Sequence, residues 1–231
     1  AREVIISFNR PTVIIGERIN PTGRKKLTEA LRAGDLEAVR KEAIDQVAAG
    51  ADIIDCNVNA PGVNDVELLP KAVQIIQKAI DAPMCLDSPN KDALEAALKV
   101  YKGKPLVNSV SGEEASLQRM LPLVKRYGCA VVGLVQDDEG IPKNAERRIA
   151  IAHKIVERAE KAGIPREDIV IDVLVFPIGA DSKTGQDVLE AIRRIREELG
   201  VNMTMGASNI SFGMPDRVII NSAWASMVIT A

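Results

Sequence analysis

The chain has 231 residues, enough for one large domain or two small ones, and its 30 basic and 32 acidic residues nearly balance. This balance leaves no strong electrostatic footprint for nucleic acid or for an anionic membrane surface. Aromatic residues make up only 3% of the chain, which further weakens a base-stacking role. The composition therefore excludes nucleic acid and membranes as the first partners to consider.

The cysteines and the apolar runs of the sequence bear on the cellular compartment in which the protein is expected to work. Cys56, Cys85 and Cys129 are odd in number and far apart, which argues against a disulfide framework and against a zinc site. No apolar run approaches the roughly 18 residues of a membrane span, and the N-terminus lacks a signal-peptide pattern. We therefore expect a cytoplasmic protein that binds no metal.

Short runs rich in Val and Ile alternate along the chain with longer amphipathic stretches. The runs are apolar on both faces, which is typical of parallel strands covered by helices. They predict strands at 12–16, 52–57, 84–87, 106–110, 130–135, 168–175 and 202–207. The stretches between and after them predict helices at 25–50, 67–80, 91–101, 114–127, 144–162, 186–199 and 216–231.

The order of these elements predicts the fold class. Gly50, Gly163 and Gly200 close three of the predicted helices just before the next strand, as C-cap glycines do. The repeated βα units favour an α/β fold of the (β/α)8 TIM-barrel type over an open doubly wound sheet. No G-x-G-x-x-G motif follows the first strand, which lowers the dinucleotide-binding alternative.

An eighth βα unit is missing from the count. We therefore expect residues 1–231 to form one barrel domain that belongs to a truncated or longer protein. The last predicted helix is nearly all apolar. This composition indicates a covered surface, which either a homodimer contact or the missing eighth unit would explain.

Polar side chains follow the predicted strands, at the edge where barrel enzymes carry out their chemistry. Any single aspartate there has a simpler explanation as the N-cap of the next helix, but the whole set predicts a polar binding cup. The strand-end residues are Glu17, Asn20, Asp55, Asn57, Asn59, Asp87, Asn108, Ser109, Gln136, Asp137, Asp172, Ser208 and Asn209.

Asp172 is the sharpest member of this set, because it stands between Ile171 and Val173 in an otherwise apolar strand. Burying an ionised carboxylate costs several kcal/mol unless it is paired. No Lys or Arg is close to it in the sequence. A ligand with adjacent N–H donors would satisfy it.

Motifs that are absent narrow the chemistry. The only histidine, His153, lies within a predicted helix and away from the strand ends. The sequence has no metal-ligand cluster, G-x-S-x-G motif, catalytic Cys–His pair or Walker loop. The pattern favours a cup that binds a neutral heterocycle rich in donors and acceptors, rather than a hydrolase site.

Seven segments, in order along nearly the whole chain, carry a family resemblance. They are GERINPTGRKK (16–26), DCNVNAPGVND (55–65), CLDS (85–88), VNS (107–109), GLVQDDEGIPK (133–143), IDVLVFPIGAD (171–181) and GASNISFGMPDR (206–217). Together they resemble the pterin-binding methyltransferases, which include the methyltetrahydrofolate:corrinoid methyltransferases and the folate domain of cobalamin-dependent methionine synthase. This resemblance implies a TIM barrel related to dihydropteroate synthase.

The resemblance also implies an activity and a site. It implies that the chain binds 5-methyltetrahydrofolate and transfers the N5 methyl group to the cob(I)alamin of a corrinoid protein or domain. Asp87, Asn108 and Asp172 match the positions that hold the pterin ring, and Asn209 matches the asparagine beside N5. Further matches around the site are Glu17, Asn20, Asp55, Asn57 and Arg217. No D-x-H-x-x-G cobalamin motif is present, so a partner is expected to carry the corrinoid.

An amide beside N5 suits this chemistry, because it can donate to or accept from N5 as the protonation state of N5 changes. The alternative for Asn209 is a purely conformational role as a left-handed turn residue. For the whole chain, the alternatives are a dihydropteroate synthase-like enzyme and a non-catalytic pterin-binding module. The first needs basic groups for a pyrophosphate leaving group, and the strand ends offer only Arg217. The second would bind methyltetrahydrofolate without demethylating it.

Overall fold

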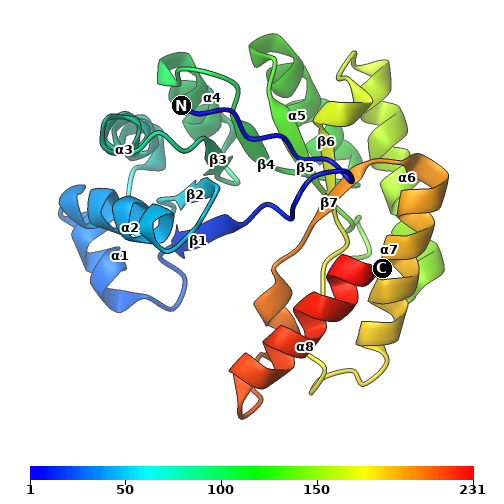
Figure 1. Cartoon of the computed structure of the whole chain (residues 1–231). Helices are drawn as coiled ribbons and strands as arrows, with labels where there is room; N and C mark the ends of the chain where they lie inside the picture. The colour runs from blue at the N-terminus through cyan, green and yellow to red at the C-terminus, as the bar shows by residue number, and fades with distance from the viewer. The chain divides into compact units, whose positions relative to one another are not determined.

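The computed structural model describes residues 1–231, and the contacts between residues divide the chain into two compact units. Unit 1 comprises Ala1–Ser109 and Arg126–Ala130, and unit 2 comprises Val110–Lys125 and Val131–Ala231. Both units are built from parallel strands joined by helices (Figure 1).

Unit 1 carries the first strands of the chain, which pair in parallel in the order β1-β2-β3-β4. The register places Asp55 beside Cys85 and Asn57 beside Asp87 on neighbouring strands. Its strands are β1 (Ile15–Ile19), β2 (Ile53–Asn57), β3 (Met84–Asp87) and β4 (Leu106–Ser111), the last of which begins in this unit. Its helices are α1 (Lys25–Arg32), α2 (Glu37–Ala48), α3 (Asp65–Ala79) and α4 (Lys91–Val100).

Helices α2, α3 and α4 pack against the strands of unit 1 and against one another. Strand residues such as Ile54 and Leu86, and Ile76 of α3, are completely buried there. Each side chain of this kind contributes about 1.5–3 kcal/mol through burial. This core holds the ends of β2 and β3 in a fixed register.

Unit 2 pairs its strands in parallel in the order β5-β6-β7, with Leu134 beside Asp172 and Asp172 beside Thr204. Helices α6 and α7 pack against each other, and α6 also contacts β6. The strands are β5 (Ala130–Leu134), β6 (Ile169–Asp172) and β7 (Asn202–Thr204). The helices are α5 (Glu114–Tyr127), α6 (Ala145–Lys161), α7 (Thr184–Leu199) and α8 (Arg217–Thr230), with short 3-10 turns η1 (Arg166–Asp168) and η2 (Ala207–Ser211).

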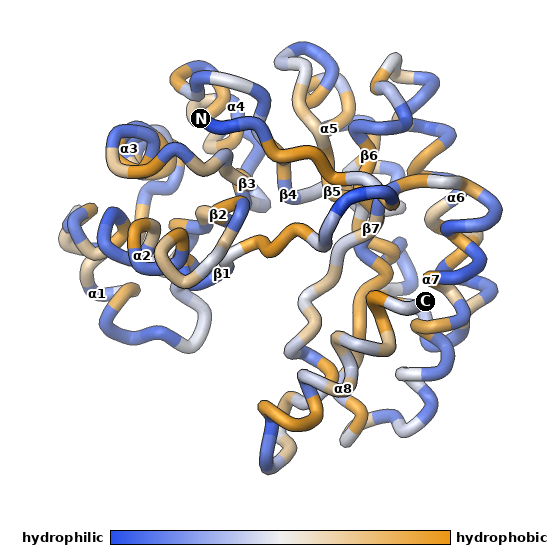
Figure 2. The backbone as a smooth tube through the Cα atoms, in the orientation of Figure 1, coloured by the Kyte–Doolittle hydropathy of each residue, from blue (hydrophilic) through white to orange (hydrophobic).

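Helix α8 contacts η2 and α7 within unit 2. Only Trp224 of this helix is buried, whereas Val218 is 78% and Ile219 is 71% exposed. Figure 2 shows the hydrophobic residues along its length. A cover for this surface, by a second copy or by an eighth βα unit, stays a prediction.

Most predicted elements are confirmed to within a few residues, and β3 and α5 are confirmed at both ends. The single helix predicted over 25–50 is wrong, because Gly34 has a left-handed φ of 70° and separates α1 from α2. Asp35 then accepts a hydrogen bond from the N–H of Glu37, the first residue of α2 (2.9 Å). The predicted cap glycines Gly50, Gly163 and Gly200 all have positive φ, as expected.

Three predicted strands have different limits. The first begins and ends about three residues later than predicted, at Ile15 and Ile19, and so contains Glu17. The strand predicted over 168–175 ends at Asp172, because Leu174 has a left-handed φ of 55°. The strand predicted over 202–207 ends at Thr204, and η2 begins soon after it.

Two further sequence expectations can be compared with the structure. The three cysteines are buried and form no disulfide. No helix combines the length and the apolar character that crossing a membrane requires.

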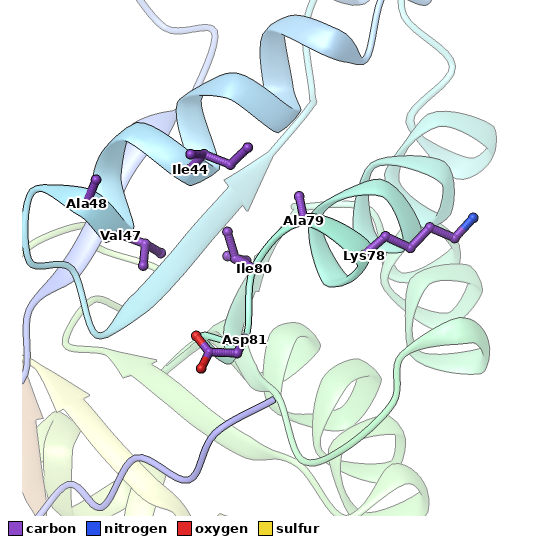
Figure 3. A pocket seen from close by; sticks show the side chains of 7 residues that line it. All are labelled: Ile44, Val47, Ala48, Lys78, Ala79, Ile80 and Asp81. Carbon is purple, nitrogen blue, oxygen red and sulfur yellow. The ribbon is translucent and has the colours of Figure 1, made fainter.

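A groove in unit 1 lies between α2 and the C-terminal end of α3 (Figure 3). Its walls are Ile44, Val47, Ala48, Ala79 and Ile80, with Lys78 and Asp81 beside them. These residues end helices that lead into β2 and β3, so the groove lies toward the start of these strands. The predicted site residues lie toward the strand ends.

Candidate functional site

The predicted site residues divide between the two units. Those of unit 1 are Glu17, Asn20, Asp55, Asn57, Asp87 and Asn108. Those of unit 2 are Asp172, Asn209 and Arg217.

In unit 1 the ends of β2, β3 and β4 bring four predicted residues together in two amide–carboxylate pairs. Asn57 donates from Nδ2 to Oδ2 of Asp87 (2.8 Å). Asn108 approaches Asp55 more loosely, with 3.5 Å between Nδ2 and Oδ1. Asp55 is only 3% exposed, and its Oδ2 atom is buried without a hydrogen-bond partner. The two carboxylates are therefore paired with amides and with no cation.

This setting favours the protonated carboxyl forms. Burial, together with the negative charges of Asp87 and Glu17, raises the pKa of Asp55 to about 8. Burial also raises the pKa of Asp87 to about 6, opposed by the Asn57 hydrogen bond and assisted by Glu17. Because the two carboxyls are coupled, they titrate as a pair. Ligand N–H donors would favour the charged form of such a pair.

Glu17 lies in the middle of β1, and Asn20 directly follows this strand. Glu17 is exposed, and Nδ2 of Asn20 lies 3.5 Å from Oε1 of Glu17. The Oδ1 atom of Asn20 accepts the N–H of Thr22 (3.0 Å), which fixes the turn into α1. In this structure Asn20 thus has a clear turn role, and Glu17 contributes negative charge near Asp55 and Asp87.

In unit 2 a buried arginine acts electrostatically on Asp172, although no Lys or Arg is close to Asp172 in the sequence. Arg148 of α6 is completely buried and donates from Nη1 to the carbonyl oxygens of Val173 and Leu174. Burial lowers the pKa of Arg148, while the negative charges of Asp187 and Asp172 oppose that shift. Oδ1 of Asp172 also accepts the N–H of Leu174 (2.8 Å).

Sequence reasoning missed Arg148 because the residue lies on a helix, 24 positions before Asp172. A signal was present, however. Arg148, Ala152, Ile155 and Ala159 recur at the spacing of one helix face, and the other three are buried and apolar. An arginine on such a stripe predicts a buried charge that requires a partner.

Asn209 lies in η2, exposed, and its side-chain amide makes no hydrogen bond within the protein. It is not among the residues with positive φ, so the left-handed turn alternative is wrong, and Asp216 has that conformation instead. A Cβ atom at Gly206 would lie 2.8 Å from Nδ2 of Asn209. The Asn209 amide therefore rests over a glycine and has donors and acceptors to offer a ligand.

Arg217, the first residue of α8, holds the turn that carries Asn209. It donates from Nη2 to the carbonyl oxygen of Ser208 (2.9 Å) and from Nε to Oγ of Ser211 (3.0 Å). Oγ of Ser211 lies 2.7 Å from Oδ1 of Asn221. These bonds fix both sides of Asn209 to α8, and the roles of Ser211 and Asn221 were not foreseen from the sequence.

Comparison with known proteins identifies relatives. The model of the pterin-binding enzyme family matches residues 16–231. The methylcorrinoid:tetrahydrofolate methyltransferase of Eubacterium limosum is 33% identical over 222 residues, which cover 93% of this chain and 80% of that protein. The methionine synthases of Mycobacterium leprae and Mycobacterium tuberculosis are each 31% identical over 93% and 92% of this chain. The chain spans about a fifth (19%) of their length.

Solved structures of dihydropteroate synthases share the fold. The enzyme of Yersinia pestis has a TM-score of 0.69 at 18% identity, covering 96% of this chain and 84% of its own. The enzyme of Xanthomonas albilineans has a TM-score of 0.66 at 19% identity, covering 97% of this chain and 86% of its own. The enzyme of Clostridium difficile has a TM-score of 0.70 at 25% identity, covering 96% of this chain and 88% of its own. The fold is therefore α/β and of the TIM-barrel type found in dihydropteroate synthase, and the chain belongs to the pterin-binding enzyme family.

Proposed function

We propose that the chain is a methyltransferase that transfers the N5 methyl group of 5-methyltetrahydrofolate to the cob(I)alamin of a corrinoid protein or domain. The observation that carries this proposal is the likeness to the Eubacterium limosum enzyme over most of both chains. The name of that enzyme gives the reverse direction, from methylcorrinoid to tetrahydrofolate. A catalyst accelerates both directions of one equilibrium, so the supply of substrates decides which direction runs.

The strand-end carboxylates suit the pterin. A pterin edge presents an amino group and a ring N–H side by side, and a carboxylate can accept both in charge-assisted hydrogen bonds. We assign this role to Asp87 and Asp172, with Asn108 as a further polar contact to the ring. Asp55, Asn57, Glu17 and Asn20 belong to the surroundings of Asp87, and Arg217 to those of Asn209. A site built this way rejects analogues that leave its buried polar groups unpaired.

Asn209 is assigned to N5. The methyl group leaves a tertiary amine, which is a poor leaving group. The electron pair of the carbon–nitrogen bond stays on N5, so N5 must carry a proton for the nitrogen to leave as a neutral amine. An amide can accept from a protonated N5 and donate to a neutral one, without a charge that would compete for the proton. Losing one preorganised contact of this kind lowers the rate by roughly 10²–10³.

The corrinoid is the co-substrate and supplies a Co(I) nucleophile for the methyl group. We propose that it is brought by a partner, because the sequence has no D-x-H-x-x-G motif. The only histidine, His153, lies on α6 and contacts Glu198 of α7 through Nε2 (2.9 Å).

The proposal is tested anaerobically with 5-methyltetrahydrofolate and free cob(I)alamin, by following the absorbance of the cobalt centre. We expect turnover above a protein-free blank, and a fall of roughly 10²–10³ in kcat for Asn209→Ala with folate binding retained. Asn9→Ala, an exposed asparagine before β1, is the matched control and should keep the wild-type rate. Wild-type turnover in Asn209→Ala would refute the role of Asn209.

The same assay separates the alternatives. A non-catalytic pterin-binding module would bind methyltetrahydrofolate and never demethylate it, even with a corrinoid protein present. A dihydropteroate synthase-like enzyme would instead release pyrophosphate from a pterin pyrophosphate. Likeness to the solved dihydropteroate synthases concerns the fold, and no basic cluster for pyrophosphate favours that activity here.

A further inference from the structure

Asp65, the first residue of α3, is a buried carboxylate outside the predicted site. Its side chain accepts three hydrogen bonds, and the residue is only 6% exposed. The donors are Nδ2 of Asn59 (3.1 Å), Oγ of Ser88 (3.1 Å) and Nδ2 of Asn90 (3.0 Å). A buried carboxylate with three side-chain donors is a fixed junction rather than a solvated helix start.

The donors come from two different loops of unit 1. Asn59 belongs to the loop that follows β2, whereas Ser88 and Asn90 belong to the loop that follows β3. Asn90 is also the N-cap of α4, with its Oδ1 accepting the N–H of Asp92 (3.0 Å). Asp65 therefore ties together the loops that leave the two strands carrying Asn57 and Asp87.

Two routes lead from Asp65 to Asp87. On the first, Asn59 donates its backbone N–H to Oδ1 of Asn57 (2.8 Å), which turns the amide NH2 of Asn57 toward Oδ2 of Asp87 (2.8 Å). On the second, Ser88, which is bonded to Asp65, directly follows Asp87 in the chain. The two routes close a ring of hydrogen bonds and backbone around the Asp87 carboxylate.

We propose that Asp65 is a positioning residue for the contact between Asp87 and the pterin, an inference that rests on the proposed function. The ring sets the orientation of the Asn57 amide and the direction of the Asp87 carboxylate before any ligand arrives. Ordering these groups in advance lowers the entropy lost on binding. Asp65 thus acts on pterin affinity through Asp87, without touching the ligand.

The primary test is Asp65→Asn. This change keeps the shape of the side chain but replaces one accepting oxygen with an NH2 group, which faces other donors and cannot accept from them. We expect the KM for methyltetrahydrofolate and the Kd for tetrahydrofolate to rise about tenfold, with kcat within about twofold of wild type. The matched control is Asp92→Asn, the same change in the first turn of α4 at an exposed residue. It should change neither constant.

A double-mutant cycle separates positioning from general destabilisation. In an Asp87→Asn background, Asp65→Asn should weaken tetrahydrofolate binding by less than about twofold further, because the carboxylate on which it acts is gone. An equal loss in both backgrounds would overturn the proposal.

A readout without folate keeps this inference separate from the proposed function. The side-chain amide resonances of Asn57, assigned with Asn57→Ser, should shift in Asp65→Asn and stay in place in Asp92→Asn. Unchanged resonances would overturn the positioning role. Shifted resonances in a protein whose wild type binds no folate would instead refute the proposed function and leave the ring established.

Discussion

The strand-end aspartates of the two units have opposite surroundings. In unit 1, Asp55 and Asp87 meet amides and each other, and burial raises the pKa of both carboxyls. In unit 2, Asp172 has the buried Arg148 and a backbone N–H nearby. The same residue type in the same place in a βα unit thus does two jobs. The unit 1 pair can hold a proton, whereas Asp172 lies in the electrostatic field of a buried cation that also holds the carbonyl oxygens after β6.

Among the changes that test this difference between the units, removing the cation of unit 2 should lower the free energy of unfolding most. Arg148→Met leaves negative charge near Asp172 and Asp187 unmatched and frees the carbonyl oxygens after β6. Leaving a buried acceptor without its donor costs about 1–3 kcal/mol, and Arg148 serves two carbonyl oxygens, so the free energy of unfolding should fall by about 2–6 kcal/mol in denaturant titrations. Arg147→Met is the control.

Arg147 precedes Arg148 and pairs with Asp137 and Glu139 at the surface, with a side chain 35% exposed. Its replacement should lower the free energy of unfolding by less than about 1 kcal/mol. Equal losses for the two neighbouring arginines would show that Arg148 has no special electrostatic role, and would erase the difference between the units.

The proton-holding pair of unit 1 predicts a smaller, pH-dependent effect. The pKa of Asp55 is about 8 in the folded protein and near 3.8 for an ordinary aspartate, so the folded state holds this proton more tightly. The stabilisation that this proton gives the folded state is fully present below about pH 4 and is lost as the pH rises through about 8. In Asp55→Asn this loss should be reduced by about 2 kcal/mol between roughly pH 6.5 and pH 9, measured by denaturant unfolding at each pH.

Asp45→Asn, at an exposed position of α2 paired with Lys41, is the control for the pH series. Its pH dependence should follow that of the wild type. If Asp55→Asn also followed the wild type, the buried carboxyl of unit 1 would hold no extra proton, and the two units would be electrostatically alike.

The smallest effect on stability is expected at Gly206. In Gly206→Ala the new methyl group would lie 2.8 Å from Nδ2 of Asn209, and this exposed amide can move away at little energetic cost. The free energy of unfolding should change by less than about 1 kcal/mol, while methyl transfer falls about tenfold. Gly185→Ala meets only an ordinary contact with Trp224 and should leave both quantities unchanged.

The sequence predicted the parts of the fold that depend on local pattern. Apolar runs located the strands, and the glycines at 50, 163 and 200 located helix ends, because these signals act within a few residues. The ends of β6 and β7 were placed too late, since the left-handed Leu174 and the turn η2 are set by partners from α6 and α8. No run of neighbouring residues records those contacts.

The candidate site follows the same rule. Amides and carboxylates at strand ends were visible in the sequence, because each closes an apolar run. Arg148 and Asp65 were not chosen, since each lies on a helix and reaches the site through contacts between separate elements. Family resemblance supplied the roles of Asn209 and Asp87, which no spacing argument gave. The roles of the site residues stay predictions for the assays above.

The positions of the cysteines make the rate of thiol labelling a measure of opening in one unit only. Cys56, Cys85 and Cys129 all belong to unit 1, are buried and form no disulfide. Burial raises the pKa of the Cys85 thiol well above its usual value, and alkylating reagents attack only thiolates. The labelling rate therefore reports how often unit 1 opens. Unit 2 has no cysteine and so contributes no labelling signal. Mass spectrometry of the alkylated wild-type chain would thus measure the opening rate of unit 1 without any engineered probe.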